Sequence, residues 1–210
     1  MFNFIDIDQN TDEWFALRAG KLTSSKLGTI MANYGKPFGE PAKKYAVTIA
    51  IEQITGNPIP SAYQNDHMIR GHEQEPIARM LYEDQTFCEV DNGGFFESVF
   101  IGCSPDGLVD IDGVIEIKSV IAHVHFASIK RQCVDPAYRW QCIGNLKFTG
   151  RDWIDFVSYC AEFPADKQLF THRLYKADLS DEFAMIDARA NEFKILVDGT
   201  REAIIKANYG

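Results

Sequence analysis

The sequence has no long hydrophobic run and no N-terminal targeting pattern. No apolar stretch approaches the roughly 20 residues that a membrane-spanning helix needs. The N-terminal segment MFNFIDIDQN is acidic, whereas a secretory signal starts with a basic segment and continues into an apolar one. These absences argue against a membrane-embedded protein, and we expect the chain to stay in the cytoplasm.

The sequence also lacks paired cysteines. Its five cysteines are odd in number and widely scattered, and no two of them form a C-x-x-C pair. Neither a zinc ribbon nor an iron–sulfur cluster is therefore indicated. We expect unpaired, buried thiols in a reducing compartment.

Positive charge is scarce as well. The 30 Asp and Glu residues outnumber the 21 Lys and Arg residues, which gives a formal net charge of −9. This charge argues against a protein that coats nucleic acid non-specifically, because phosphate binding relies on Lys and Arg. A concave basic site on an otherwise acidic body is still compatible with it.

What the chain does have is the composition of a globular protein, with 46% hydrophobic residues and mixed charges. Its 210 residues are enough to bury a sizeable core. No internal repeat, low-complexity tract or linker interrupts the sequence. We therefore expect a single domain over residues 1–210.

Periodicity, capping residues and turn residues predict groups of helices and strands. Helices are expected from Thr11 or Asp12 to Gly20, from a cap at 23–25 onward, and over 41–54, 67–82, 136–148 and 181–206. Strands are expected over 95–101, 114–118, 153–159 and 172–175, with a Pro-rich loop over 57–66. This order predicts a central mixed β-sheet flanked by helices, an α/β (α+β) fold. On a strand, His123 and His125 would face one way, but no third ligand accompanies them, so we assign them no metal.

The stretch from Cys103 to Lys118, CSPDGLVDIDGVIEIK, organises the rest of the chain. Strand alternation places Glu116 and Lys118 on one face, and the isoleucines that alternate with them form the natural core face. The Asp-Gly turns in this stretch can bend the chain so that Asp106 meets Glu116 and Lys118. Two carboxylates and an ammonium suit a hard cation such as Mg²⁺. An exposed strand that carries Glu and Lys for solubility explains this stretch equally well.

Three further positions are candidates for binding or catalysis. Arg18 stands near the hydroxyl-rich helix start at 23–25, where free N–H groups, the helix dipole and a guanidinium can hold a phosphate. An ordinary capped helix is the alternative there. Gln141 lies on a helix between basic residues and can face a phosphate backbone, or it can mark the polar edge of a half-buried helix. Glu75 is a candidate acid, although an exposed helical Glu is usually only solvated.

Taken together and in order, these segments resemble the lambda-type phage exonucleases. This group is also called YqaJ-type or alkaline exonucleases and is a branch of the PD-(D/E)xK nucleases. The resemblance runs from about Thr11 to Pro164. Its motifs are Trp14, Arg18, Gly20, Thr23 and Ser25; Gly71 and Glu75; Cys103 to Leu108 together with Glu116 and Lys118; and Tyr138 and Gln141. Four ordered motifs are far more specific than one, so the resemblance favours the functional interpretation of Arg18, Glu75 and Gln141.

The resemblance implies a restriction-endonuclease-like core and a processive, Mg²⁺-dependent exonuclease. Such an enzyme digests the 5′-phosphorylated strand of duplex DNA in the 5′→3′ direction, releases mononucleotides and leaves a 3′ single-stranded overhang for recombination. The resemblance further implies a ring-shaped homotrimer around DNA in the cytoplasm of a bacterial host, and a phage single-strand annealing protein as partner. A site-specific endonuclease of the same core and a non-catalytic DNA-binding module are the alternatives.

The resemblance also assigns roles to individual residues. Asp106, Glu116 and the backbone carbonyl of Ile117 would hold one or two Mg²⁺ ions, with Mn²⁺ as a substitute. Lys118 would orient or activate the attacking water, and Glu75 would complete the acidic cluster. The remaining positions, expected to hold the terminal 5′-phosphate, are Arg18, Ser25 and Gln141. The segment after Lys118 lacks the proline that often follows in relatives, which leaves the local strand ends open.

Overall fold

A computed structural model of the chain describes residues 2–60 and 66–207, so the predicted loop over 57–66 lies in part outside the described residues. The helices are α1 (Asp12–Arg18), α2 (Leu27–Met31), α3 (Glu40–Thr55), α4 (Asp66–Thr86), α5 (Ala122–Arg131), α6 (Arg139–Thr149) and α7 (Ser180–Lys206). Short 3-10 turns are η1 (Ser24–Lys26), η2 (Ala165–Lys167) and η3 (Lys176–Asp178). The strands are β1 (Asn3–Ile5), β2 (Leu22–Thr23), β3 (Val90–Asp91), β4 (Phe95–Glu97), β5 (Ile101–Cys103), β6 (Gly107–Val109), β7 (Gly113–Ser119), β8 (Trp153–Tyr159) and β9 (Leu169–Tyr175).

A mixed five-stranded sheet with the order β3-β6-β7-β8-β9 forms the centre of the fold. Strand β7 is antiparallel to β6 and parallel to β8, and β9 closes the edge in antiparallel register. The parallel connection from β7 to β8 runs through α5 and α6, because two parallel strands need a long crossover. The predicted mixed α/β fold is confirmed.

Both faces of β7 are buried. Ile115 and Ile117 pack with Tyr82 of α4, as the alternation predicts, and each fully buried side chain of this size contributes about 1.5–3 kcal/mol. The opposite face is covered as well, since Val114 belongs to a second and larger core. Glu116 on that face has no exposed surface, which excludes the alternative that it serves solubility.

A second, four-stranded sheet has the order β1-β4-β5-β2. The prediction of one strand over 95–101 is wrong, because this segment folds into the antiparallel strands β4 and β5. Ser98 makes the turn between them: its N–H donates to the carbonyl of Ile101 at 2.7 Å, and its hydroxyl accepts the N–H of Ile101 at 3.2 Å. A strand pattern alone does not reveal such a side-chain-assisted turn.

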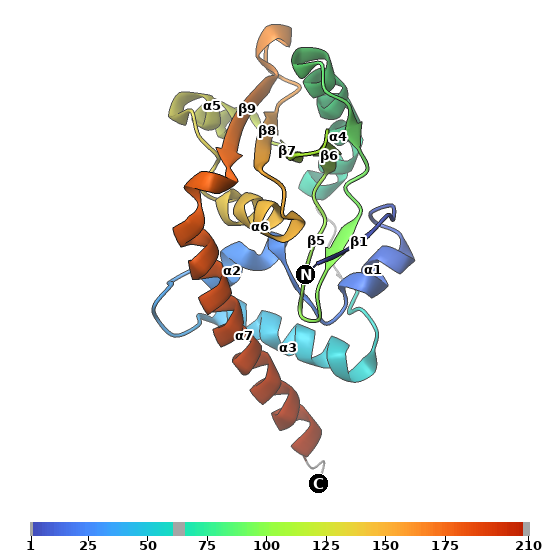
Figure 1. Cartoon of the computed structure of the whole chain (residues 1–210), viewed down its shortest axis with the longest axis vertical. Coiled ribbons are helices and arrows are strands. Elements are labelled where there is room, and N and C mark those ends of the chain that lie inside the picture. The colour runs from blue at the N-terminus through green and yellow to red at the C-terminus, as the bar shows by residue number, and fades with distance from the viewer. Residues whose placement is uncertain (1, 61–65, 208–210) are drawn as a thin grey trace.

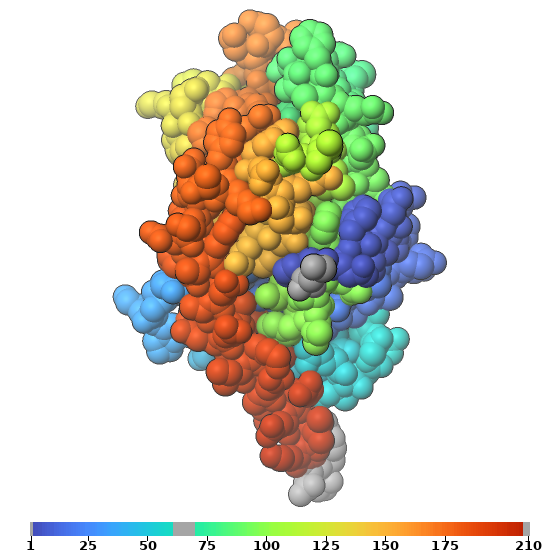
Figure 2. All heavy atoms as spheres, viewed as in Figure 1, coloured from blue at the N-terminus to red at the C-terminus, as the bar shows by residue number. Residues whose placement is uncertain are grey.

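The helices cover the two sheets unequally. Helix α4 packs on β7, whereas α6 lies between β8, β5 and α7. Helix α7 packs against α2 and α3, and Figure 1 shows its C-terminal part extending past α3. The predicted stripe of α7 is confirmed in Ile186, Phe193 and Val197, which are buried. In the space-filling view of Figure 2, the end of α7 forms the narrow lower tip of the molecule.

The segment after β7 is a helix, so His123 and His125 do not share a strand face. Residues two apart on a helix point to nearly opposite sides, and His123 is exposed whereas His125 is fully buried. One ring nitrogen of His125 is 2.8 Å from the Ser158 hydroxyl, and the other is 2.9 Å from the Lys167 carbonyl oxygen. His125 thus joins α5 to β8 and η2.

Other predicted elements differ only at their ends. Helix α6 starts at Arg139 and not at Pro136, since Tyr138 N–H closes a turn onto the carbonyl of Asp135. Strand β9 is longer than the predicted 172–175. Helix α4 continues through Pro76. Within the described ranges, no helix is both long and apolar enough to cross a membrane.

Candidate active site

The β6–β7 hairpin positions Asp106. This residue immediately precedes β6, and its N–H donates to the carbonyl of Ile115 at 3.1 Å. Its Oδ2 accepts the N–H of Ile117 at 2.6 Å, so the carboxylate is fixed against the edge of β7. The guanidinium of Arg79, from α4, donates to the Asp106 carbonyl. The predicted approach of Asp106 to β7 is therefore present.

Glu116 is fully buried, and hydrogen bonds hold both of its carboxylate oxygens. Oε1 accepts from the ammonium of Lys118 and from the side-chain amide of Gln141. Oε2 accepts from Nδ2 of Asn145 at 2.6 Å. Two of these partners come from α6, so this helix and β7 together define the orientation of the carboxylate.

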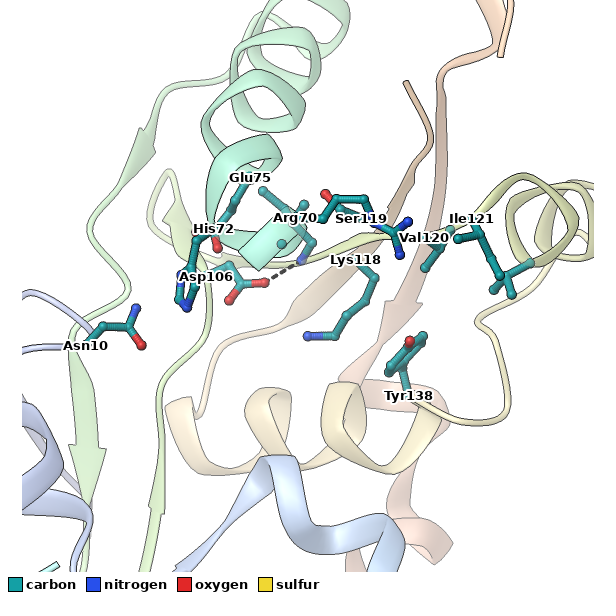
Figure 3. Close-up of a pocket in the computed structure, with 13 residues that line it drawn as sticks. Asn10, Arg70, His72, Glu75, Asp106, Lys118, Ser119, Val120, Ile121 and Tyr138 are labelled. Carbon is teal, nitrogen blue, oxygen red and sulfur yellow. Dashed lines mark hydrogen bonds between the residues drawn. The ribbon is translucent and has the colours of Figure 1, made fainter. Parts of the chain in front are cut away.

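A cavity of about 650 Å³ opens beside these groups. Figure 3 shows Glu75 and His72 reaching down from α4 towards Asp106, while Lys118 extends across from β7. The ring of Tyr138 forms the opposite wall, with its centroid 5.5 Å from the Lys118 nitrogen. We refer to Glu75, Asp106, Glu116 and Lys118 as the acid cluster.

The acid cluster concentrates negative charge in a buried place. Burial raises the pKa of Asp106. Burial and then the neighbouring Asp106 raise the pKa of Glu75 to about 7 and also raise the pKa of Glu116. Burial opposes the charge on Lys118, but attraction to Glu116 and Asp106 outweighs it and raises the pKa of the ammonium. Three carboxyl groups therefore face two cations, the Lys118 ammonium and the Arg79 guanidinium, and the cluster favours an added cation.

The predicted metal ligands fit a hard divalent cation. In a strand, the N–H and C=O of one residue point to the same side, and the Ile117 N–H points to Asp106. The pairing of β6 with β7 ends at Gly107 and Ile115, so the Ile117 carbonyl lies beyond the end of β6. Carboxylate and carbonyl oxygens are the donors that such an ion prefers. Within the described ranges, no three His, Cys, Asp or Glu side chains are grouped so that they could hold a metal ion by themselves. The predicted ligand set therefore needs the backbone carbonyl of Ile117.

The predicted phosphate residues separate into two groups. Nη2 of Arg18 is 3.5 Å from the hydroxyl of Ser25, and its guanidinium stacks 4.1 Å from the centroid of the Trp14 ring. The Ser25 hydroxyl is also 3.1 Å from that of Thr23. We call Arg18 and Ser25 the phosphate pocket, after the role that was predicted for them. Gln141, in contrast, donates a hydrogen bond to Glu116 and therefore lies next to the acid cluster.

Two local features of the predicted phosphate site differ from the simplest expectation. Thr23 does not cap a helix with its side chain, because the chain enters a 3-10 turn at Ser24 before α2 begins. The sequence leaves the second feature open: Arg139 and Lys147, the basic residues on either side of Gln141, pair with Glu182 and Asp187 of α7, which favours the alternative of a polar helix edge. The sequence could not show that α7 would supply these partners.

Asn145 and Ser24 are the residues that the sequence interpretation missed. The hydroxyl of Ser24 donates to Oδ1 of Asn145, whose Nδ2 holds Glu116. This chain of bonds connects the turn that carries Ser25 to the acid cluster. A signal was present, since Asn145 is a polar residue one helical turn after Gln141 on an otherwise apolar side of α6.

Known proteins can now be compared with this geometry. The family model of the YqaJ-like viral recombinase domain matches residues 13–152. Among solved structures, the alkaline exonuclease LHK-Exo from Laribacter hongkongensis is 32% identical with a TM-score of 0.82, and the match covers 93% of this chain and 97% of that chain. The same enzyme in complex with dAMP gives 33% identity and a TM-score of 0.82 over 92% and 96% of the two chains.

A phage-related exonuclease from Haemophilus somnus 129PT is more distant. It is 18% identical with a TM-score of 0.64, over 91% of this chain and 98% of that chain, and supports the fold alone. No curated protein matches the chain significantly. The family match covers more than half of the sequence, and the identity to LHK-Exo extends over nearly all of it. The chain therefore belongs to the YqaJ-like viral recombinase family and is a deoxyribonuclease.

Proposed function

We propose that this deoxyribonuclease is a Mg²⁺-dependent exonuclease that degrades the 5′-phosphorylated strand of duplex DNA in the 5′→3′ direction. The observation that carries the proposal is the arrangement of three residues of one hairpin: Asp106 and Lys118 line one cavity, and the buried Glu116 accepts a hydrogen bond from Lys118. Nucleases of this family generally use divalent metals. The products would be mononucleotides and a 3′ single-stranded overhang suited to phage recombination.

Each residue of the acid cluster has a role in this proposal. Asp106, Glu116 and the Ile117 carbonyl would hold one or two Mg²⁺ ions, with Mn²⁺ as a substitute. A bound ion supplies Lewis acidity and lowers the pKa of its water. Lys118 reaches into the cavity as a charged donor and would orient the attacking water. Glu75, which is half-buried on α4, would complete the cluster through bound water.

The end preference would come from the phosphate pocket. A guanidinium binds a terminal phosphate dianion more strongly than a mid-chain diester, because the terminal group carries more charge and more free oxygens. Arg18 and Ser25 would provide these contacts, and Gln141 would join them from α6. LHK-Exo has been solved in complex with dAMP, a nucleoside monophosphate, which supports mononucleotide release by this chain.

The assembly belongs to the proposal as well. Residues 1–210 would form one nuclease domain, and three copies would form a ring around duplex DNA. A phage single-strand annealing protein would bind the overhang that the nuclease exposes.

The decisive experiment follows a linear duplex that carries separate labels near its 5′ and 3′ ends and a 5′-phosphate on one strand. With MgCl₂, we expect early loss of the label near the 5′-phosphate as mononucleotide, with the other strand left intact. A closed circular duplex serves as the control and should stay intact. Cutting of the circle would instead support a site-specific endonuclease, and earlier release of the 3′ label would overturn the polarity.

A further inference from the structure

Asn145 holds one oxygen of Glu116 from a completely buried position. The residue has no exposed surface, and its Nδ2 donates to Glu116 Oε2 at 2.6 Å. Its Oδ1 accepts from the Ser24 hydroxyl. Because a carboxylate can only accept and the hydroxyl can donate, these two neighbours determine which way the amide points. Asn145 therefore presents its amide donor to Glu116 and to no alternative partner.

The other partners of Glu116 are exposed to the cavity or assigned to substrate. Lys118 lines the cavity and is expected to meet water or phosphate there. Gln141 is half-buried and is expected to bind the terminal phosphate. Water and substrate compete with Glu116 for the donors of these two side chains. Asn145, in contrast, is fully buried, and it is expected to bind neither the water in the cavity nor the terminal phosphate.

We propose that Asn145 is a positioning residue that holds the Glu116 carboxylate in the orientation needed to bind the metal ion. The hydrogen bond from Ser24 to Asn145 couples this orientation to the phosphate pocket. The proposal rests on the proposed function in two respects, namely that Glu116 ligates the divalent ion and that Arg18 and Ser25 bind the 5′-phosphate. Partners of metal ligands fix the orientation of the ligand, and their loss typically weakens metal affinity about 10–100-fold.

Ser24 connects Asn145 to the phosphate pocket, because it bonds Asn145 and is the chain neighbour of Ser25. It is 2% exposed and directly precedes Ser25, whose hydroxyl is 3.5 Å from Arg18. A phosphate that draws Ser25 and Arg18 together acts on the same 3-10 turn that carries the Ser24 hydroxyl. Binding of a 5′-phosphate and binding of the ion should then strengthen each other by the same factor, as linkage requires.

The test compares Asn145→Ala and Ser24→Ala with a matched control, Thr149→Val. Thr149 lies one turn further along α6, and its hydroxyl donates to the backbone carbonyls of Asn145 and Leu146 and accepts the backbone N–H of Arg151. Mn²⁺ binding without DNA is measured by calorimetry, and melting temperature is measured in EDTA. We expect Asn145→Ala to weaken Mn²⁺ binding about 10–100-fold, Ser24→Ala about fivefold, and Thr149→Val not at all.

Further measurements separate positioning from general stability. The double variant should bind Mn²⁺ no more weakly than Asn145→Ala, because Ser24 acts through Asn145. On duplex DNA, Asn145→Ala should lower kcat at limiting Mn²⁺, and a higher Mn²⁺ concentration should restore part of it, whereas a loss of folded protein lowers the apparent kcat at every Mn²⁺ concentration. A phosphorothioate duplex with a 5′-phosphate should tighten Mn²⁺ binding to the unmutated protein and to Thr149→Val, but not to Ser24→Ala.

Failure of the inference is distinguishable from failure of the proposed function. If the unmutated protein digests linear duplex and Asn145→Ala retains its Mn²⁺ affinity, the positioning role is wrong and the nuclease assignment stands. If Asn145→Ala does not fold, Ser24→Ala decides, and unchanged Mn²⁺ affinity in that variant overturns the proposal. If the unmutated protein binds Mn²⁺ but digests nothing, the proposed function fails and the affinities still test Asn145.

Discussion

The acid cluster and the phosphate pocket are built in opposite ways. In the acid cluster, Glu116 is fully buried and its two carboxylate oxygens accept from three side chains, while Asp106 is fixed to β7 by a 2.6 Å bond. In the phosphate pocket, Arg18 is half-buried, lies over an aromatic ring and reaches Ser25 only at 3.5 Å. One part of the site is tightly bonded within the protein, and the other is loosely bonded.

This difference follows from where each part lies in the fold. Glu116 is on the central strand of the sheet, between two cores, and a buried carboxylate without partners would be very costly. Arg18 is at the C-terminal end of a seven-residue helix and is half-buried. A ligand can reorganise the phosphate pocket at little cost, whereas it must match the acid cluster as it stands. We therefore expect the two parts to respond differently to mutation.

The largest effect should come from the acid cluster. Asp106→Ala removes a ligand oxygen and the acceptor of the Ile117 N–H, so the developing charge on the phosphate loses its support. We expect digestion of linear duplex in Mg²⁺ to fall at least about a thousandfold. The far-UV circular dichroism spectrum should not change. Wild-type rates in Asp106→Ala would show that the acid cluster is not the catalytic centre.

A smaller and more selective effect should come from the phosphate pocket. Arg18→Ala removes a charge-assisted contact, and we expect the preference for 5′-phosphorylated over 5′-hydroxyl ends to fall about 10–100-fold. The rate on 5′-hydroxyl ends should change little. The measurement is the initial rate on two duplexes that differ only in this group.

Arg139→Ala is the matched control for Arg18→Ala. Arg139 also lies near Gln141 in the sequence, but it pairs with Glu182 of α7 and stands outside the site. Its loss should leave the end preference unchanged and cost at most about 1 kcal/mol of stability. Equal rates on both kinds of end in the unmutated protein would remove the phosphate pocket from the mechanism.

The two parts of the site also differ in how well the sequence predicts them. Asp106, Glu116 and Lys118 lie in or next to one local hairpin, so the turn residues and the strand alternation suffice to bring Asp106 close to β7. The partners of Arg139 and Lys147 come from α7, about 40 residues later, and no local pattern contains them. The same holds for Asn145, whose role depends on Glu116, 29 residues earlier in the sequence, and on Ser24, 121 residues earlier.

Secondary structure shows the same limit. Strand β8 and helix α7 are predicted almost to the residue, because each has a long and regular apolar pattern. Strands β4 and β5 are wrongly predicted as one, since Ser98 makes a turn with its side chain inside an apolar run. The segment of His123 and His125 is a helix, although its alternating pattern fits a strand equally well. Tertiary contacts decide such short segments.

The smallest expected effect concerns stability without metal, and it again separates the two parts of the site. Burial raises the pKa of Asp106, Glu75 and Glu116 in the folded state, so the folded protein binds more protons than the unfolded chain. This contribution to stability is fully present below the ordinary carboxyl pKa near 4, and it is lost as pH rises through the raised values, about 7 for Glu75.

In EDTA, we therefore expect the melting temperature to fall by about 5 °C between pH 5 and pH 8. Saturating MgCl₂ should remove most of this fall, because the ion binds the ionised cluster and stabilises the folded state. Asp106→Asn should flatten the profile in EDTA, since it removes one of the three buried carboxyl groups, whereas Arg18→Ala should leave the slope intact. A profile that is the same with and without MgCl₂ would mean that the buried negative charge is not what binds the cation, and the contrast between a fixed acid cluster and an adaptable phosphate pocket would then lose its electrostatic basis.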